Sequence, residues 1–128
     1  MEKTSKTVIT DDWPVLVLRT SDNLEASQHA LDVVEEIYAT HQEPYAIVLD
    51  ARDGRKPSAD ERNLQNDFRI KHEEYVRKYC RGSALVCNSA VIRGIAAAMF
   101  WFKKPDTVTK AFTDMDEAMA WAHSLLEQ

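Results

Sequence analysis

The spacing of apolar residues along this chain changes from one segment to the next and predicts alternating strands and helices. Residues 6–10 and 15–18 are short runs rich in β-branched and aliphatic side chains, separated by two aspartates, a tryptophan and a proline. Because aspartate and proline favour turns, this pattern predicts a hairpin. Apolar residues then recur with helical spacing over residues 23–41, where we expect a first helix. Asp22, three residues before Glu25, is expected to cap it.

The middle of the chain predicts a buried strand followed by a long helix. Residues 45–49 form a continuous apolar run, which is typical of a central strand buried on both faces. After a polar loop, Ser58 and Glu61 have the spacing of a capping box, so a second helix is expected from there to Cys80, just before Gly82. Its buried stripe is expected to comprise Leu64, Phe68, Tyr75, Val76 and Tyr79, with His72 packed among them.

The last third of the chain repeats the alternation. Residues 84–87 have the pattern of a buried strand, and Asn88 or Ser89 can cap a third helix over residues 90–102. Residues 107–112 predict a last strand.

A terminal helix is expected after Asp114, which can form a third cap with Glu117. Its apolar stripe is expected to comprise Met115, Ala118, Ala122 and Leu125. Strands that alternate with helices require right-handed crossovers and a largely parallel sheet covered by helices. The sequence therefore predicts a single α/β domain over residues 1–128, ordered β-β-α-β-α-β-α-β-α. Its sheet should be mostly parallel and five-stranded, with an antiparallel leading hairpin.

The composition is that of an ordinary globular protein, with 45% hydrophobic and 29% charged residues among 128. A formal net charge of −5 disfavours nucleic acid and anionic lipid as partners. No stretch reaches the ~20 apolar residues needed to span a bilayer, and the first residues lack the apolar core of a signal peptide. We expect a cytoplasmic protein without a transmembrane segment.

Cysteine and glycine positions argue against common metal and cofactor sites. Cys80 and Cys87 do not have the spacing of a zinc motif, and two cysteines do not make a disulfide scaffold in a domain of this size. Gly54, Gly82 and Gly94 stand alone, so the sequence has no glycine-rich phosphate-binding loop. We expect buried thiols in a reducing compartment, with no metal, no cofactor and no catalytic residues.

Three segments near the end of the chain share a pattern with a known family. They are the strand at residues 84–87, the helix opening at residues 89–93, and residues 110–121. In the last of these, a strand ending in Phe is followed by an acidic cap, Glu-Ala and Ala-Trp. This region resembles the SpoIIAA-like branch of the STAS superfamily, whose order of elements the whole chain shares. The resemblance implies a STAS fold and a non-catalytic module that binds partner proteins.

Some STAS domains are switched by phosphorylation of a serine that begins the second helix, after an Asp-Ser-Ser-Gly-like motif. That motif is absent here, and only Ser58 occupies a comparable place, preceded by Pro57. As a helix cap, Ser58 would contribute about 1 kcal/mol. As a phosphoserine, it would gain from the helix dipole and from Arg52, Arg55 and Lys56. We expect Ser58 to be an unmodified cap.

The predicted third helix is apolar around its whole circumference, because Arg93 is the only polar residue among residues 90–102. A helix on a protein surface should have a polar face. Its large side chains could be buried by the terminal helix and loops, or they could form a surface for self-association, a partner protein or an apolar ligand. The candidate contact residues are Met99, Phe100 and Trp101, with Arg93 and Lys103 at the polar rim.

Polar residues also follow the predicted buried strands, at the edge of the sheet where open α/β folds usually bind ligands. The candidates there are Asp50, Arg52, Ser58, Asn88 and Ser89. We expect Asp50 to accept hydrogen bonds from backbone N–H groups of the loop that follows it. A role as a base is not expected, because no second titratable group is placed to work with it.

The expected function is that of a non-enzymatic interaction or regulatory domain that binds a partner protein, with a homodimer as one form of that binding. One alternative is a carrier of a small apolar or lipid-like ligand, which would use the apolar third helix as a pocket wall. The other is a small enzyme of unknown reaction, working through Asp50, Arg52 and Ser89.

Overall fold

Five strands form one sheet in the order β1-β2-β3-β4-β5, in a computed structural model that describes residues 7–20, 23–52, 58–88 and 108–127. The first pair is antiparallel and the other three pairs are parallel. This confirms the predicted hairpin and the predicted parallel sheet, although the first strand is shorter than the run at residues 6–10. The strands are β1 (Val8–Ile9), β2 (Val15–Arg19), β3 (Tyr45–Asp50), β4 (Cys80–Val86) and β5 (Thr109–Phe112).

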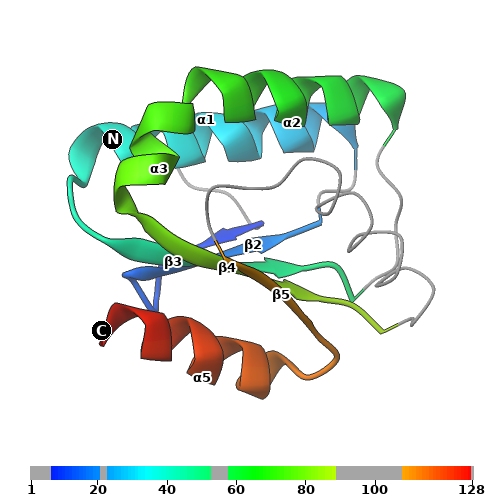
Figure 1. The fold of residues 1–128 in the computed structure, drawn as a ribbon. Coiled ribbons are helices and arrows are strands. Elements are labelled where there is room, and N and C mark those ends of the chain that lie inside the picture. Colours follow the sequence, from blue (N-terminus) through cyan, green and yellow to red (C-terminus); the bar gives the residue numbers. More distant parts are fainter. Residues whose placement is uncertain (1–6, 21–22, 53–57, 89–107, 128) are drawn as a thin grey trace.

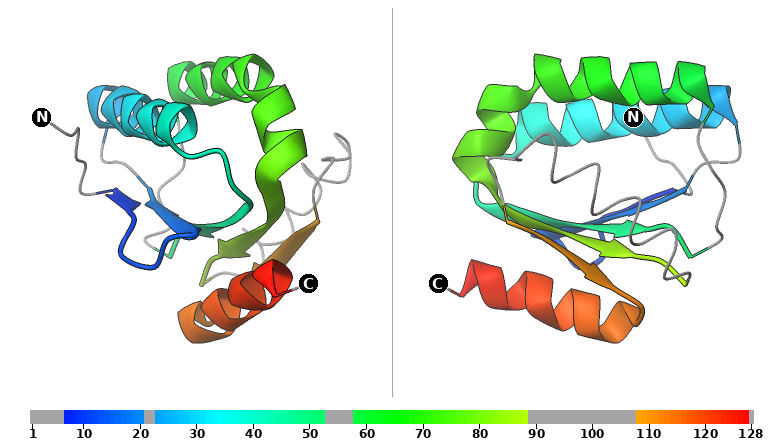
Figure 2. Two further views of the ribbon diagram at one scale, coloured as in Figure 1. Left: turned by 90° about the vertical axis from the view of Figure 1, so that its left-hand side faces the viewer. Right: turned by 45° about the vertical axis from the view of Figure 1, so that its right-hand side comes forward.

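Helices cover both faces of this sheet (Figure 1). Those on one face are α1 (Leu24–Thr40), α2 (Ala59–Lys71) and α3 (Glu73–Tyr79), and α5 (Met115–Leu126) lies on the other. The views in Figure 2 show α1 and α2 side by side, with the sheet between them and α5. The predicted layered α/β architecture is therefore confirmed in the described part of the chain. The predicted third helix at residues 90–102 lies outside it.

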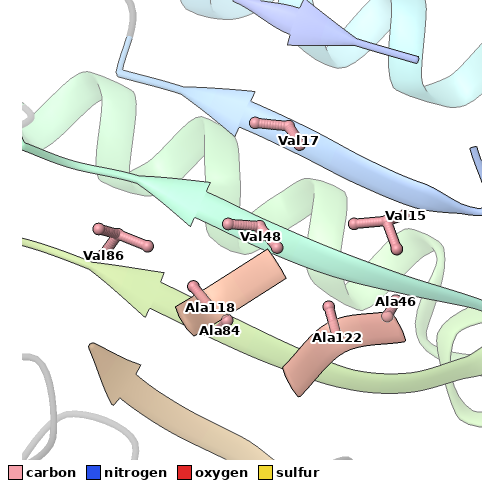
Figure 3. Packing of buried hydrophobic residues seen from close by; sticks show 8 residues of the cluster. All are labelled: Val15, Val17, Ala46, Val48, Ala84, Val86, Ala118 and Ala122. Atoms are coloured by element: carbon pink, nitrogen blue, oxygen red, sulfur yellow. The ribbon is translucent and has the colours of Figure 1, made fainter. Parts of the chain in front are cut away.

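The side chains of each strand alternate between the two helix layers, as the pleat of a strand requires. In β2, Val15 and Val17 point toward α5, whereas Leu16 belongs to the cluster beneath α1. Ala118 and Ala122, four residues apart on α5, are fully buried, and their small side chains let the helix lie close to the sheet. The cluster on the α5 side contains Val15, Val17, Ala46, Val48, Ala84, Val86, Ala118 and Ala122 (Figure 3).

The opposite cluster is rich in aromatic rings. Tyr45 is fully buried, and its hydroxyl donates a hydrogen bond of 2.9 Å to the hydroxyl of Tyr38. The ring of Trp13 stacks on it at 5.9 Å, and the ring of Tyr75 lies at 5.8 Å. Because the hydrogen bond satisfies the polar end of Tyr45, its ring can lie in the core at little cost. Burial raises the pKa of both Tyr38 and Tyr45 above the ordinary tyrosine value.

The predicted second helix is interrupted at His72, which has φ −108° and ψ 17° and separates α2 from α3. The His72 ring packs 4.4 Å from the ring of Phe68, and its Nε2 lies 3.0 Å from a carboxylate oxygen of Glu35 on α1. These contacts confirm the expected packing role of His72. They also anchor the interruption, which apolar spacing alone does not reveal.

One predicted helix boundary and one predicted strand boundary need correction. Helix α1 is capped by Asn23, whose side-chain oxygen accepts a hydrogen bond of 2.8 Å from the backbone N–H of Ala26, and not by Asp22. The helix end predicted near Cys80 is confirmed, since α3 ends at Tyr79, but the next strand begins at Cys80 and not at residue 84. The cap predicted at Asp114 is confirmed, since its carboxylate accepts from the backbone N–H of Glu117 at 3.1 Å.

Gly82 is needed where β4 passes beneath α5. A Cβ atom at this position would lie 2.5 Å from Cδ1 of Leu125, 3.1 Å from the carbonyl oxygen of Val108 and 3.3 Å from Cη2 of Trp121. The leucine can move, but the backbone carbonyl can do so only by shifting the strand. The glycine therefore sets the distance between the sheet and the helix.

We expect Gly82→Ala to lower the free energy of unfolding by about 1–3 kcal/mol, because overpacking outweighs the entropy that alanine saves. Denaturant unfolding measures the effect. Arg81→Ala, at the exposed neighbouring position, is the control and should stay within about 0.5 kcal/mol of the unsubstituted protein. A stabilised Gly82→Ala protein would contradict the close approach of α5.

Candidate functional site

The carboxyl ends of β2, β3 and β4 meet at one edge of the sheet, on the right-hand side of Figure 1. Asp50 is the last residue of β3, the middle strand, and it pairs with Arg19 on β2 and Val86 on β4. Asn88 follows β4 by two residues. Parallel strands thus place polar residues from three segments side by side, at the edge where such sheets usually bind ligands.

Asp50 is only 8% exposed, and its carboxylate is paired with Arg52. The guanidinium group donates through Nε to Oδ1 and through Nη2 to Oδ2, each at 2.8 Å, and the backbone N–H of Arg52 donates to Oδ1 at 3.2 Å. Arg19 adds a looser ion pair, with its Nε 3.7 Å from Oδ2. Two parallel N–H···O bonds fix the arginine more firmly than one contact would.

These partners keep Asp50 ionised. The side-chain hydrogen bonds from Arg52 hold the pKa of Asp50 below its usual value of 3.8, although partial burial acts in the opposite direction. The same bonds raise the pKa of Arg52. A carboxylate with a lowered pKa and both oxygens engaged is a weak proton acceptor near neutral pH. Asp50 was expected to accept a hydrogen bond from a backbone N–H group of the following loop, and the N–H of Arg52 confirms this. The hydrogen bonds from the Arg52 side chain were not predicted.

Arg19, Thr20, Asp50, Arg52 and Asn88 line an open hollow of about 480 Å³, which we call the strand-end surface. The Arg19 and Arg52 side chains are 54% and 42% exposed. Asn88 donates from Nδ2 to the carbonyl oxygen of Arg52 at 2.6 Å and so ties the end of β4 to the segment after β3. The sequence prediction included Asp50, Arg52 and Asn88 but missed Arg19 and Thr20. Their position just after the apolar run of β2 is the signal that could have identified them.

The Asp50–Arg52 pair has a consequence for acid stability. Because folding lowers the pKa of Asp50, the pair contributes stability fully above pH 3.8, the usual pKa of an aspartate. This contribution is lost as the pH falls from there toward the lower pKa of the folded protein. We therefore expect Asp50→Asn and Arg52→Gln each to lose less stability than the unsubstituted protein over that range. Urea unfolding at a series of pH values measures the free energy of unfolding of the three proteins. If this free energy fell equally with pH in all three, the pairing of Asp50 with Arg52 would be contradicted.

Ser58 is not among the described residues that line this surface, and it caps α2. Its hydroxyl accepts from the backbone N–H of Glu61 at 3.1 Å, and the Glu61 carboxylate accepts from the backbone N–H of Ser58 at 3.3 Å. The predicted capping box is therefore confirmed. Glu61 is also only 2% exposed and accepts a 2.8 Å hydrogen bond from the hydroxyl of Ser27 on α1. This link between the helices was missed at the level of sequence.

We expect Ser58→Ala to lower the free energy of unfolding by about 1 kcal/mol and to leave association with other proteins unchanged. Thermal unfolding and sedimentation measure the two properties. Ser58→Asp is the matched variant, because aspartate also caps helices and should recover most of the loss. Phosphate on Ser58 in protein purified from its native cells would overturn its assignment as an unmodified cap.

The remaining predicted residues lie outside the part of the chain that the structure describes. They are Ser89, Arg93, Met99, Phe100, Trp101 and Lys103. Among residues 7–20, 23–52, 58–88 and 108–127, no group of three or more His, Cys, Asp or Glu side chains is placed to hold a metal ion. None of the helices in these ranges is long and apolar enough to cross a membrane. Both cysteines are buried and neither is in a disulfide, and burial raises the pKa of Cys80.

Comparisons with known proteins place this fold beside that of a solved structure. No family model matches the chain. No curated protein matches it either. A solved structure from Shewanella loihica PV-4, described as an uncharacterized DUF3478-family protein with a SpoIIAA-like fold, superposes with a TM-score of 0.63 at 16% sequence identity. The match covers 84% of this chain and 82% of the other. The chain therefore has a SpoIIAA-like fold, and the resemblance seen in its last third is confirmed at the level of fold.

Proposed function

We propose that this chain is a non-enzymatic interaction domain that binds a partner protein through the strand-end surface. The observation that carries the proposal is the pair of exposed guanidinium groups, Arg19 and Arg52, held beside a carboxylate whose charge Arg52 already balances. Arginine is favoured in protein interfaces because its planar head offers several donors and its stem packs on apolar surface. A second copy of the chain is one candidate partner.

Binding fits the strand-end surface better than catalysis does. General acid–base chemistry needs a group that exchanges protons near neutral pH within reach of a substrate. Asp50 has a lowered pKa and is held by Arg52, whose own pKa is raised. The other described residues that line the surface, Thr20 and Asn88, are neutral. The carrier hypothesis depends on Met99, Phe100 and Trp101, so it draws no support from the described residues.

Affinity capture from cells that naturally produce the protein tests the proposal. We expect a protein to be recovered with the unsubstituted chain and to be lost with Arg19→Glu, which reverses the charge on the strand-end surface. Arg69→Glu makes the same change on the exposed face of α2, where Arg69 contacts Asn66, and should recover the protein normally. Circular dichroism verifies that all three proteins are folded.

Sedimentation of the same three proteins covers the case in which the partner is a second copy. A dimer that Arg19→Glu dissociates and Arg69→Glu preserves would support the proposal. Equal recovery with Arg19→Glu would mean that another surface binds the partner. A chain that captures no protein and sediments as a monomer would end the proposal.

A further inference from the structure

The guanidinium group of Arg19 on the strand-end surface is exposed and donates no hydrogen bond to the described residues. We infer that Arg19 binds the carboxylate of an acidic side chain of the partner protein. This inference rests on the proposed function and names the chemical group that the surface recognises.

The donors of the two arginines are used differently. Arg52 commits Nε and Nη2 to the two oxygens of Asp50. Arg19 lies 3.7 Å from the same carboxylate, beyond hydrogen-bonding distance, and its guanidinium donates no hydrogen bond to any described residue. With 54% of its side chain exposed, Arg19 can present a planar fork of N–H donors to an incoming group. That fork matches the two oxygens of a carboxylate.

The charges on this surface favour a group with one negative charge. Asp50 and Arg52 balance each other, so Arg19 supplies one net positive charge among the lining residues that the structure describes. Asp114 and Asp116, at the start of α5, are close enough to raise the pKa of Arg52 and add negative charge nearby. A dianionic phosphate would meet more repulsion from these carboxylates than a monoanionic carboxylate would. The surface therefore suits an acidic residue better than a phosphorylated one.

The groups beside Arg19 are held in place by hydrogen bonds within the chain. Asn88 fixes the carbonyl of Arg52, and Arg52 in turn fixes Asp50, which lies beside Arg19 at the end of the adjacent strand. The backbone N–H of Thr20 donates to the carbonyl oxygen of Asp50 at 3.2 Å, so the chain just after Arg19 is tied to β3. Because these groups are ordered in the free protein, binding costs less conformational entropy.

The test is an NMR titration of the isotope-labelled full chain at constant ionic strength. The probes are the blocked tripeptide acetyl-Gly-Glu-Gly-amide, its Gln counterpart, and inorganic phosphate at a pH where it is dianionic. We expect the Glu peptide to give saturable shifts at the Nε–H of Arg19 and the amides of Thr20, Arg52 and Asn88. The Gln peptide should give none, and phosphate should bind more weakly than the Glu peptide.

Arg19→Gln should weaken binding of the Glu peptide about tenfold, while Arg69→Gln, the matched change on α2, should leave it unchanged. Equal shifts from the Glu and Gln peptides, tighter binding of phosphate, or an unaffected Arg19→Gln protein would each overturn the inference. If a partner is captured but the Glu peptide does not bind, the carboxylate assignment fails and the proposed function stands. If the Glu peptide binds at Arg19 but no protein is captured, the proposed function fails and the carboxylate site stands.

Discussion

Glu61→Ala is expected to lower the free energy of unfolding by about 2–3 kcal/mol, because it leaves two polar groups without the carboxylate they bind. These are the hydroxyl of Ser27 on α1, itself 5% exposed, and the backbone N–H of Ser58. The substitution also leaves a space between α1 and α2. Urea unfolding followed by circular dichroism measures the loss.

Two further variants show whether the cause is the buried carboxylate. Glu61→Gln keeps one acceptor oxygen of similar size and should lose less stability than Glu61→Ala. Glu74→Ala removes an exposed glutamate from α3 and should change the free energy of unfolding by no more than about 0.5 kcal/mol. A Glu61→Ala protein as stable as the Glu74→Ala protein would mean that the contact between Ser27 and Glu61 does not hold the helices together.

Tyr45→Ala is expected to be the most damaging of these substitutions, with a loss of about 3–5 kcal/mol. Tyr45 is fully buried on the central strand, and its ring is surrounded by the rings of Trp13, Tyr38 and Tyr75. Removing the ring leaves a cavity in the core. The strands and helices around the cavity are fixed in position, so they cannot move in to fill it. Thermal and chemical unfolding together measure the effect.

Tyr45→Phe separates packing from hydrogen bonding. It keeps the ring and removes only the hydroxyl that donates to Tyr38, so a loss of about 1 kcal/mol is expected. If Tyr45→Phe cost as much as Tyr45→Ala, the hydrogen bond rather than the ring contacts would stabilise this cluster. Tyr79→Ala, at the less buried edge of the same cluster, should fall between the two.

The sequence predicted the sheet well because each strand has its own local signal. The apolar run at residues 45–49 requires burial on both faces, and β3 indeed lies in the middle of the sheet with helices above and below. Boundaries that depend on tertiary contacts were predicted less well. The strand predicted from residue 84 begins at Cys80 instead, where β4 pairs with Tyr45 of β3. The interruption at His72, where the ring lies against Glu35 of α1, has no signal in the apolar spacing.

The position of the candidate residues was predicted in part for the same reason. Asp50 and Asn88 directly follow apolar strands, so their place at the carboxyl edge could be read from the pattern. The partner of Asp50 could not be predicted, because nothing in the sequence shows that the Arg52 side chain turns back to bind this carboxylate. Arg19 was overlooked because its neighbour in space, Asp50, is 31 positions along the chain and only the pairing of β2 with β3 brings them together.

The location of the bound partner is the most direct test of the proposed function. Cross-saturation NMR, with the captured protein saturated and this chain isotope-labelled, identifies the amides that lie against the partner. Binding through the strand-end surface predicts the largest effects at Thr20, Arg52 and Asn88. Effects confined to Trp13 and Glu43 would contradict this proposal. These two residues share a hydrogen bond and precede β2 and β3, at the amino-terminal ends of the strands.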